Sequence, residues 1–287
     1  MDPRQVPLGA MTRIARQAAR LAVPDGERFD PRRLDRRDPE AIAAVLPHLE
    51  ELTARWLKLR VEGLEHLVRR PTLFVGNHNG GIMGPDLFCT LATLWRHFGP
   101  EAPLYAMAHD FAMRRVTPLG RMLQRVGGMR ADPANAVRVL EHGGMVLVYP
   151  GGDLDAFRHY SRRDQIVFGR RTGFVRVAQE ANVPIVPVVA HGAHRSAIIL
   201  HEGEWIARAL GLTGWSRLAR FPIALAVPWG VCVGPWVPYF PLPFPIRLRI
   251  LPAIEVRRDV DAGTIRDDIV ARMQHAMDEM AREEAST

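Results

Sequence analysis

The chain has 287 residues, of which 47% are hydrophobic, and its formal net charge is +7. This length and apolar content can supply a sizeable core, which excludes a wholly disordered chain. Because Lys58 is the only lysine, the positive charge is almost entirely arginine. Arginine pairs well with phosphate and suits anionic lipid headgroups, CoA phosphates or nucleic acid, although a general bias towards arginine gives the same excess.

The cysteine content and the hydropathy of the sequence indicate the cellular compartment in which the chain works. Cys89 and Cys232 both lie in apolar surroundings, so we expect packing residues and no disulfide framework. The N-terminal residues lack the apolar core of a signal peptide, and no run reaches the ~18 uninterrupted apolar residues of a spanning helix. We therefore expect a cytoplasmic protein that is soluble or associates peripherally with a membrane.

Residues 1–60 are predicted to hold amphipathic helices and a linker. Residues 8–22 place apolar side chains near one helical face and arginines elsewhere. Such a basic helix either docks on the protein body or lies in a membrane interface. Residues 23–38 are rich in Pro, Arg and Asp and read as a linker. A second helix is predicted from Asp38, its N-cap, to about Arg60.

Strands and helices are predicted to alternate through residues 61–287, taken as one domain. The expected strands cover residues 72–76, 103–107, 145–149, 184–190, 223–233 and 246–251. The expected helices cover residues 85–98, 115–126, 133–142, 172–182, 202–211 and 262–283. This alternation predicts an α/β fold with a mixed, largely parallel central sheet flanked by helices.

Residues 235–246 combine many prolines with aromatic side chains. The prolines forbid a helix and disfavour a central strand. The aromatic residues fit a membrane-interface anchor or the wall of an acyl-chain pocket. A loop packed across the core accounts for them equally well.

The clearest chemical signal is Asn77-His78 at the end of the apolar strand 72–76. In open α/β sheets, ligands bind beyond the carboxyl ends of the strands, so His78 stands where catalysis is expected. A glycine-rich turn follows, and Asp86 lies at the start of the next helix. A histidine oriented by a carboxylate is the minimal general base for activating a hydroxyl group. We therefore predict that Asp86 returns to contact the imidazole.

Two downstream segments could bind an anion or a carbonyl group. After Gly127-Gly128, Arg130 precedes a helix start whose first-turn N–H groups are free. After the strand 145–149, Pro150-Gly151-Gly152 lets the backbone approach a ligand closely. The polar residues that follow this second turn are Asp153, Asp155, Arg158, Arg170 and Arg171.

A third segment is the buried strand 184–190, which leads to His191 and His194. Two histidines at this spacing invite a metal interpretation. No third ligand stands at a suitable distance along the chain, so no metal site is expected.

Together these segments resemble the four motifs of the glycerolipid acyltransferase superfamily, in order and spacing, over roughly residues 61–252. The matching residues are Asn77, His78 and Asp86 for the first motif, Gly127, Gly128, Asn135 and Ala136 for the second, Tyr149 to Asp153 for the third, and Val183 to Pro187 for the fourth. The resemblance implies that family's fold and its activity, which is acyl transfer to lysophospholipids and related alcohols.

The first and third motifs depart from the common family pattern. Seven residues separate His78 from Asp86, more than the family's usual four. Pro-Gly-Gly replaces Pro-Glu-Gly at Pro150, which is similar to the type-2 diacylglycerol acyltransferase and phytyl ester synthase branch. That branch uses neutral acceptors such as diacylglycerol or long-chain alcohols, so the resemblance leaves the acceptor open.

The resemblance also assigns roles to the site residues. His78 takes the hydroxyl proton, Asp86 holds the imidazole, and the glycine turns offer N–H groups to the oxyanion. The predicted substrate contacts are Asn77, Gly80, Gly81, Arg130, Gly151, Gly152, Asp153, Arg158, Arg170 and Arg171. We expect no cofactor besides acyl-CoA or acyl carrier protein as co-substrate. The expected partners are this donor, a lipid acceptor and a membrane surface, and not nucleic acid.

Two other functions remain open from the sequence. A lipid or thioester hydrolase would use the same residues with water in place of the alcohol. A non-catalytic lipid-binding protein of the membrane surface would have the same basic and apolar character.

Overall fold

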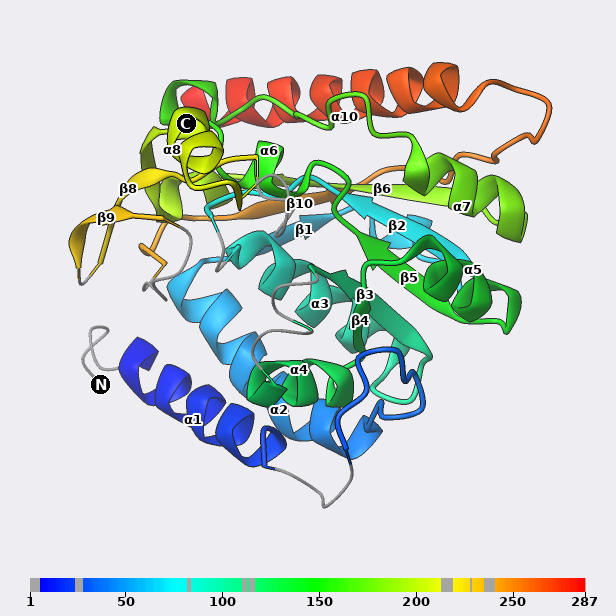
Figure 1. Ribbon diagram of the computed structural model, residues 1–287, viewed down its shortest axis with the longest axis horizontal. Helices are drawn as coiled ribbons and strands as arrows, with labels where there is room; N and C mark the ends of the chain where they lie inside the picture. Colours follow the sequence, from blue (N-terminus) through cyan, green and yellow to red (C-terminus); the bar gives the residue numbers. More distant parts are fainter. Residues whose placement is uncertain are drawn as a thin grey trace.

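The computed structural model describes residues 6–23, 28–81, 84–109, 113, 117–212, 219–227, 229–234 and 241–286. Within these ranges, helices enclose a seven-stranded central sheet, and a small three-stranded sheet extends from one side (Figure 1). The fold is therefore α/β, as the sequence predicts.

The central sheet is mixed and largely parallel, which confirms the expected topology. Its strands are β1 (Arg60–Glu62), β2 (Thr72–Gly76), β3 (Leu104–Ala108), β4 (Gly128–Arg130), β5 (Met145–Val148), β6 (Ile185–His191) and β10 (Arg247–Ile250). Their order across the sheet is β1-β10-β6-β2-β5-β3-β4. Strand β2 pairs in parallel with both β5 and β6, whereas β10 is antiparallel to β6.

Helices cover both faces of this sheet. The α-helices are α1 (Val6–Leu21), α2 (Pro39–Glu51), α3 (Pro85–Phe98), α4 (Thr117–Arg125), α5 (Pro133–Glu141), α6 (Gly152–Ala156), α7 (Gly173–Ala181), α8 (Glu204–Ala209) and α10 (Ala262–Ala285). Helices α5, α7 and α10 pack on one face, and α2 and α3 pack on the other (Figure 1).

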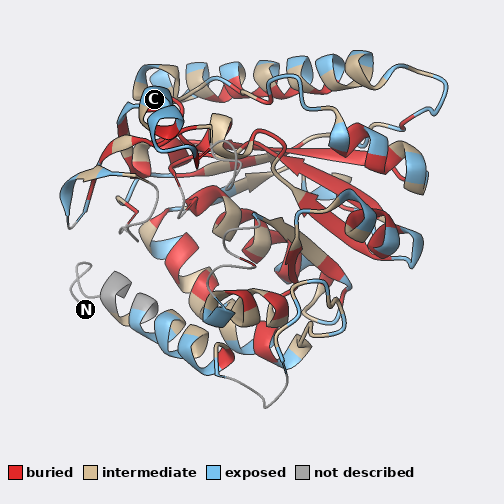
Figure 2. Ribbon diagram, in the orientation of Figure 1, coloured by how far each residue is buried: buried red, intermediate tan, exposed pale blue. Residues whose placement is uncertain are grey.

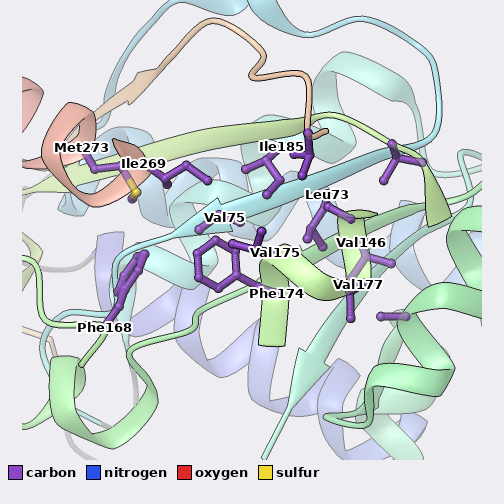
Figure 3. Close-up of a cluster of buried hydrophobic side chains, with 14 of the residues drawn as sticks. Leu73, Val75, Val146, Phe168, Phe174, Val175, Val177, Ile185, Ile269 and Met273 are labelled. Atoms are coloured by element: carbon purple, nitrogen blue, oxygen red, sulfur yellow. The ribbon is translucent and has the colours of Figure 1, made fainter. Parts of the chain in front are cut away.

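The alternation of side chains along β2 explains why this strand is apolar throughout. Leu73 and Val75 point into the cluster that contains Phe174 of α7 and Ile269 of α10 (Figure 3). Phe74 points to the opposite face, where α3 packs. Because both faces of a central parallel strand are buried, every side chain of β2 is apolar or small enough to pack.

Capping residues made the starts of α2 and α5 predictable. The Asp38 carboxylate accepts a hydrogen bond of 3.0 Å from Ala41 N–H, and a proline follows at the first helical position. Asp132 caps α5 in the same way, through Ala134 N–H at 3.2 Å. Each cap satisfies a backbone donor that the helix itself leaves without a partner.

The N-terminal helix lies against the protein body. Helix α1 packs on α2, on the π-helix at Leu52–Trp56 that continues α2, and on α4 (Figure 1). An ion pair between Arg13 and Glu51 joins α1 to the end of α2. Residues 8–22 therefore dock on the protein body, which is one of the two arrangements expected from the sequence. The division of the chain at residue 60 stays a prediction.

The prediction of one long strand over residues 223–233 is wrong. The chain forms two strands, β8 (Ile223–Ala226) and β9 (Gly230–Val233), which pair antiparallel as a hairpin. Gly230, at φ +73°, adopts a conformation that allows the chain to reverse. Strand β7 (Ile198–His201) completes this second sheet.

The proline-rich segment lies only partly within the described residues, since residues 235–240 fall outside them. The remainder packs on the body: Trp56 donates its indole N–H to Pro241 O at 2.8 Å, and Leu242 N–H bonds to Ser196 O at 3.1 Å. This part of the segment therefore behaves as a loop packed across the protein. None of the described helices combines the length and apolar character needed to cross a bilayer.

Candidate functional site

Three parallel strands direct their carboxyl ends to one edge of the central sheet. Strand β2 leads to His78, β5 leads to Tyr149, and β6 ends at His191. The register aligns Val75 with Val148 and Gly76 with Val188, so the segments that follow these strands start side by side. The site can therefore be built from the residues just after β2 and β5.

His78 and Asp86 are in contact, as the sequence predicts. His78 Nδ1 lies 3.1 Å from Asp86 Oδ2, although seven residues separate them along the chain. Gly80 and Gly81, at φ +71° and +74°, let the intervening segment fold back. Asp86 is fully buried in the first turn of α3, where the free N–H groups of the helix favour a carboxylate. The His78 side chain remains 20% exposed.

This contact sets the protonation properties of the imidazole. Burial alone would lower the pKa of His78, but the charge of Asp86 and its hydrogen bond act in the opposite direction and raise that pKa above its ordinary value. A carboxylate at Nδ1 holds the proton on that nitrogen. Nε2 is then the nitrogen with a free lone pair, as a general base requires.

Close packing leaves the dyad little room to move. A Cβ on Gly84 would lie 2.4 Å from His78 Cε1 and 2.8 Å from Asp86 Oδ1, so only glycine fits between them. The Tyr149 ring lies against the imidazole, with 5.1 Å between ring centroids. Burial raises the pKa of the Tyr149 hydroxyl well above its ordinary value, so the phenol stays neutral.

Asn77 has a structural place, not a substrate-facing one. Its amide donates to Ala190 O at 3.0 Å and accepts from Ala190 N–H at 2.8 Å. The buried side chain thereby continues the pairing of β2 with β6 beyond the end of β2. Both ends of the amide are used by the backbone, so the structure does not support the predicted substrate contact.

Three of the four glycine N–H groups that were expected for the oxyanion bond to protein atoms instead. Gly80 N–H donates to His194 Nδ1 at 3.1 Å, Gly81 N–H to Ala156 O at 3.0 Å, and Gly152 N–H to Tyr149 O at 3.1 Å. Gly151 instead allows close packing, because a Cβ there would lie 2.4 Å from Asp155 Cβ.

Arg158 is also placed differently from the prediction. Its side chain is fully buried and forms an ion pair with the equally buried Asp155, at 2.8 Å. The guanidinium group also donates to Asn79 Oδ1 and to the carbonyl oxygens of His78, Asp155, Arg162 and Arg163. All of its donors are directed at protein atoms, so the structure does not support binding of a phosphate by Arg158.

Asp155 was missing from the predicted site. A sequence signal for it existed, since Asp155 and Arg158 stand three residues apart next to a glycine turn, the spacing at which side chains meet on a helical turn. What could not be found from the sequence is that Asp155 Oδ2 accepts the His78 backbone N–H at 2.6 Å.

The remaining predicted polar residues divide into two groups. Arg171 donates to the carbonyl oxygens of Pro150 and Gly151 at 2.9 and 2.7 Å and pairs with Asp153 at 2.9 Å. Arg171 and Asp153 therefore stabilise the turn after β5.

Arg130 and Arg170 stay candidates for an anionic ligand. Arg170 is exposed, and Arg130 is half-buried beside Asp132 at 3.4 Å.

His194 serves as a bridge within the site. Nδ1 accepts from Gly80 N–H, and Nε2 donates to Arg158 O at 2.8 Å. Burial and the charge of Arg158 lower the pKa of His194 to about 3, so this imidazole is neutral. Both ring nitrogens are thus used. Within the described ranges, no group of three or more His, Cys, Asp or Glu side chains is arranged to hold a metal ion.

Comparison with known proteins identifies an acyltransferase region. The family model "Acyltransferase" matches residues 58–191, which include His78 and Asp86. The crystal structure of the 1-acyl-sn-glycerophosphate acyltransferase PlsC from Thermotoga maritima is similar to this fold, with a TM-score of 0.50 and 17% identity over 84% of this chain and 82% of that one.

Three relatives share parts of the sequence. An uncharacterized protein of Mycobacterium tuberculosis is 27% identical over 65% of this chain and 52% of its own length. The bovine DGAT1/2-independent enzyme synthesizing storage lipids is 26% identical over 47% of this chain and 39% of its own. Human diacylglycerol O-acyltransferase 2 is 24% identical over 45% of this chain and 35% of its own length. The chain thus spans about half the length, or less, of these curated relatives.

Proposed function

Because this chain belongs to the glycerolipid acyltransferase superfamily, we propose that it transfers a fatty acyl group from an acyl thioester to the hydroxyl group of a lipid alcohol. The observation that carries the proposal is the 3.1 Å contact of His78 Nδ1 with Asp86 Oδ2 at the carboxyl end of β2. The partial exposure of His78 lets a hydroxyl group reach it, while Asp86 stays behind it, away from solvent.

His78 Nε2 removes the hydroxyl proton as the acceptor oxygen attacks the thioester carbonyl carbon. Asp86 stabilises the imidazolium that forms and holds the ring in one orientation. When the tetrahedral intermediate collapses, its C–S bond breaks and the departing thiolate takes the proton back from Nε2. The acyl group passes directly to the acceptor, and the chain has no Gly-x-Ser-x-Gly segment that would suit an acyl-enzyme.

A neutral lipid alcohol is the acceptor that we favour. Arg158, which follows the third motif, is fully buried and pairs with Asp155, so it does not offer charge to a phosphate. One of the relatives is named diacylglycerol O-acyltransferase 2. Both observations support diacylglycerol or a long-chain alcohol over a lysophosphatidate.

The deciding experiment measures CoA release and acylated lipid together. Purified protein is given acyl-CoA with diacylglycerol, hexadecanol, lysophosphatidate or no acceptor, beside the His78→Ala variant. We expect ester formation that depends on acceptor and falls by ~10²–10⁴-fold in His78→Ala. CoA release that is indifferent to acceptor would identify a hydrolase. If neither the unaltered protein nor His78→Ala forms product, and both bind the lipid equally, the chain is a non-catalytic lipid-binding protein.

For the membrane surface, we propose that the sheet β7–β8–β9 makes the contact. One face of this sheet exposes apolar side chains, among them Leu225, Val231 and Val233, and Val231 is 64% exposed. Exposed apolar area of this kind is typical of a surface that meets a lipid or another protein.

Sedimentation with phospholipid vesicles tests this contact. We expect the double substitution Val231→Thr/Val233→Thr to weaken binding, because it keeps the β-branched shape and adds hydroxyl groups. Val68→Thr is the matched control, since Val68 is 56% exposed outside this sheet. Unchanged binding of the double variant would exclude the sheet as the contact.

A further inference from the structure

We propose that the buried ion pair Asp155–Arg158 positions the catalytic histidine by holding both peptide groups that flank His78. The inference rests on the proposed function and adds two positioning residues to it. Neither residue touches the reacting atoms; both act through the backbone of His78.

The two contacts lie on opposite sides of the His78 Cα. Asp155 Oδ2 accepts from His78 N–H at 2.6 Å, and Arg158 Nη1 donates to His78 O at 2.9 Å. The first bond holds the peptide group before the Cα, and the second holds the one after it. Together they restrict both backbone torsions of His78, which set the direction in which its side chain leaves the backbone.

The pair is itself held in one place. Asp155 Oδ1 accepts from Val167 N–H at 3.0 Å as well as from Arg158 at 2.8 Å. Arg158 also donates to Arg162 O at 2.9 Å and Arg163 O at 2.7 Å. The residues that surround α6 therefore fix the carboxylate and the guanidinium before they reach His78.

A third tie connects the same arginine with strand β6. Arg158 donates to Asn79 Oδ1, and Asn79 donates to Ala190 O at 3.0 Å. Ala190 is the residue that also pairs with the Asn77 side chain. The segment Asn77–Asn79 is thus anchored on β6 from one side and on the ion pair from the other.

Stability alone does not account for a fully buried pair of charges. Removing two charges from water is costly, and apolar replacements of similar size are often neutral or stabilising. The pair can contribute more by placing the catalytic group, because an error of about 1 Å in the position of such a group can lower the rate by about 10²-fold. Asp86 orients one end of the imidazole, and the ion pair fixes the backbone from which it extends.

Arg158→Lys is the variant that separates these roles, because lysine keeps the charge but cannot reach all the acceptors that the guanidinium group holds. We expect kcat per folded molecule to fall by about 10–10²-fold while KM for acyl-CoA stays within about twofold. We also expect the pKa of His78, followed by NMR, to fall towards its ordinary value as the contact with Asp86 loosens.

Arg249→Lys is the matched control. The Arg249 side chain, on β10, is 17% exposed and pairs with Glu62 at 2.7 Å and with Glu279 at 2.9 Å. None of its described bonds reaches His78, Asp155 or Arg158, so the kcat and the His78 pKa of this variant should match those of the unaltered protein.

Three outcomes would overturn the inference: an unchanged His78 pKa, an unchanged kcat per folded molecule, or an effect confined to KM. The NMR titration needs no turnover, so it tests the positioning even where the proposed acyl transfer fails. If Arg158→Lys does not fold, Asp155→Asn repeats the test with a smaller change of shape. In that variant we expect the same loss of kcat without an effect on KM.

Discussion

At the scale of single residues, the contacts of each side chain decide whether it can act on a substrate. His78 and Asp86 were predictable because a histidine after a buried strand and a carboxylate at the next helix start are local features. The burial of Arg158 was not predictable, because its hydrogen-bond acceptors include His78 O, 80 residues away along the chain. An arginine beside a glycine turn looks the same in sequence whether it binds a phosphate or a set of carbonyl oxygens.

Asp86→Asn tests the dyad through the pH dependence of kcat/KM. The carboxylate raises the pKa of His78 by stabilising the imidazolium form. Without that charge the base loses its proton at lower pH, so the acid limb should move to lower pH while the plateau falls by about 10²–10⁴-fold. The exposed Asp267→Asn serves as control. An acid limb that stays in place would show that Asp86 does not act on the base.

At the scale of elements, length decides what periodicity can predict. Helix α10 buries a stripe that includes Ile269, Met273 and Met277, while its other face is exposed (Figure 2). This stripe repeats at the helical spacing over about three turns, from Ile269 to Met280, so the helix was predictable from its pattern. Strands β1 and β4 have only three residues, which is too short for a pattern.

Met277→Ala tests how strongly α10 is held to the sheet. Met277 is 1% exposed, so we expect its truncation to lower the free energy of unfolding by about 2–4 kcal/mol, measured in a denaturant titration. Arg272→Ala on the exposed face should change it by less than about 0.5 kcal/mol, because its pair with Asp268 is exposed. Equal effects of the two substitutions would mean that the apolar stripe does not hold the helix.

At the scale of the whole molecule, the centre of the site contributes to the pH dependence of folding. His194 is neutral in the folded chain because burial lowers its pKa to about 3, from an ordinary value of 6.5. Between these two values the unfolded chain binds the proton and the folded chain does not. Falling pH therefore favours unfolding throughout that window.

His194→Gln isolates this contribution in denaturant titrations at pH 7 and pH 5. Glutamine can accept from Gly80 N–H and donate to Arg158 O without titrating. The unaltered protein should lose about 2 kcal/mol more than the variant over this interval, at about 1.36 kcal/mol per pKa unit below pH 6.5. His78, whose pKa is raised, changes the unfolding free energy with pH in the opposite direction. This contribution is the same in the unaltered protein and in His194→Gln, so it cancels in the comparison. Parallel pH dependences would show that His194 is protonated in the folded state.

The sequence by itself determined the α/β class, most helix starts and ends, the strand that carries His78, and the carboxylate that meets it. These depend on periodicity, capping residues and short spacings, which are local properties of the chain. Only the tertiary structure decided which polar groups are already used. Asn77, Gly80, Gly81, Gly152 and Arg158 all bond to protein atoms, and most of their partners lie far away in the sequence. The physical reason is that a buried donor or acceptor must find a partner within about 3 Å, and the fold alone determines which atoms come that close.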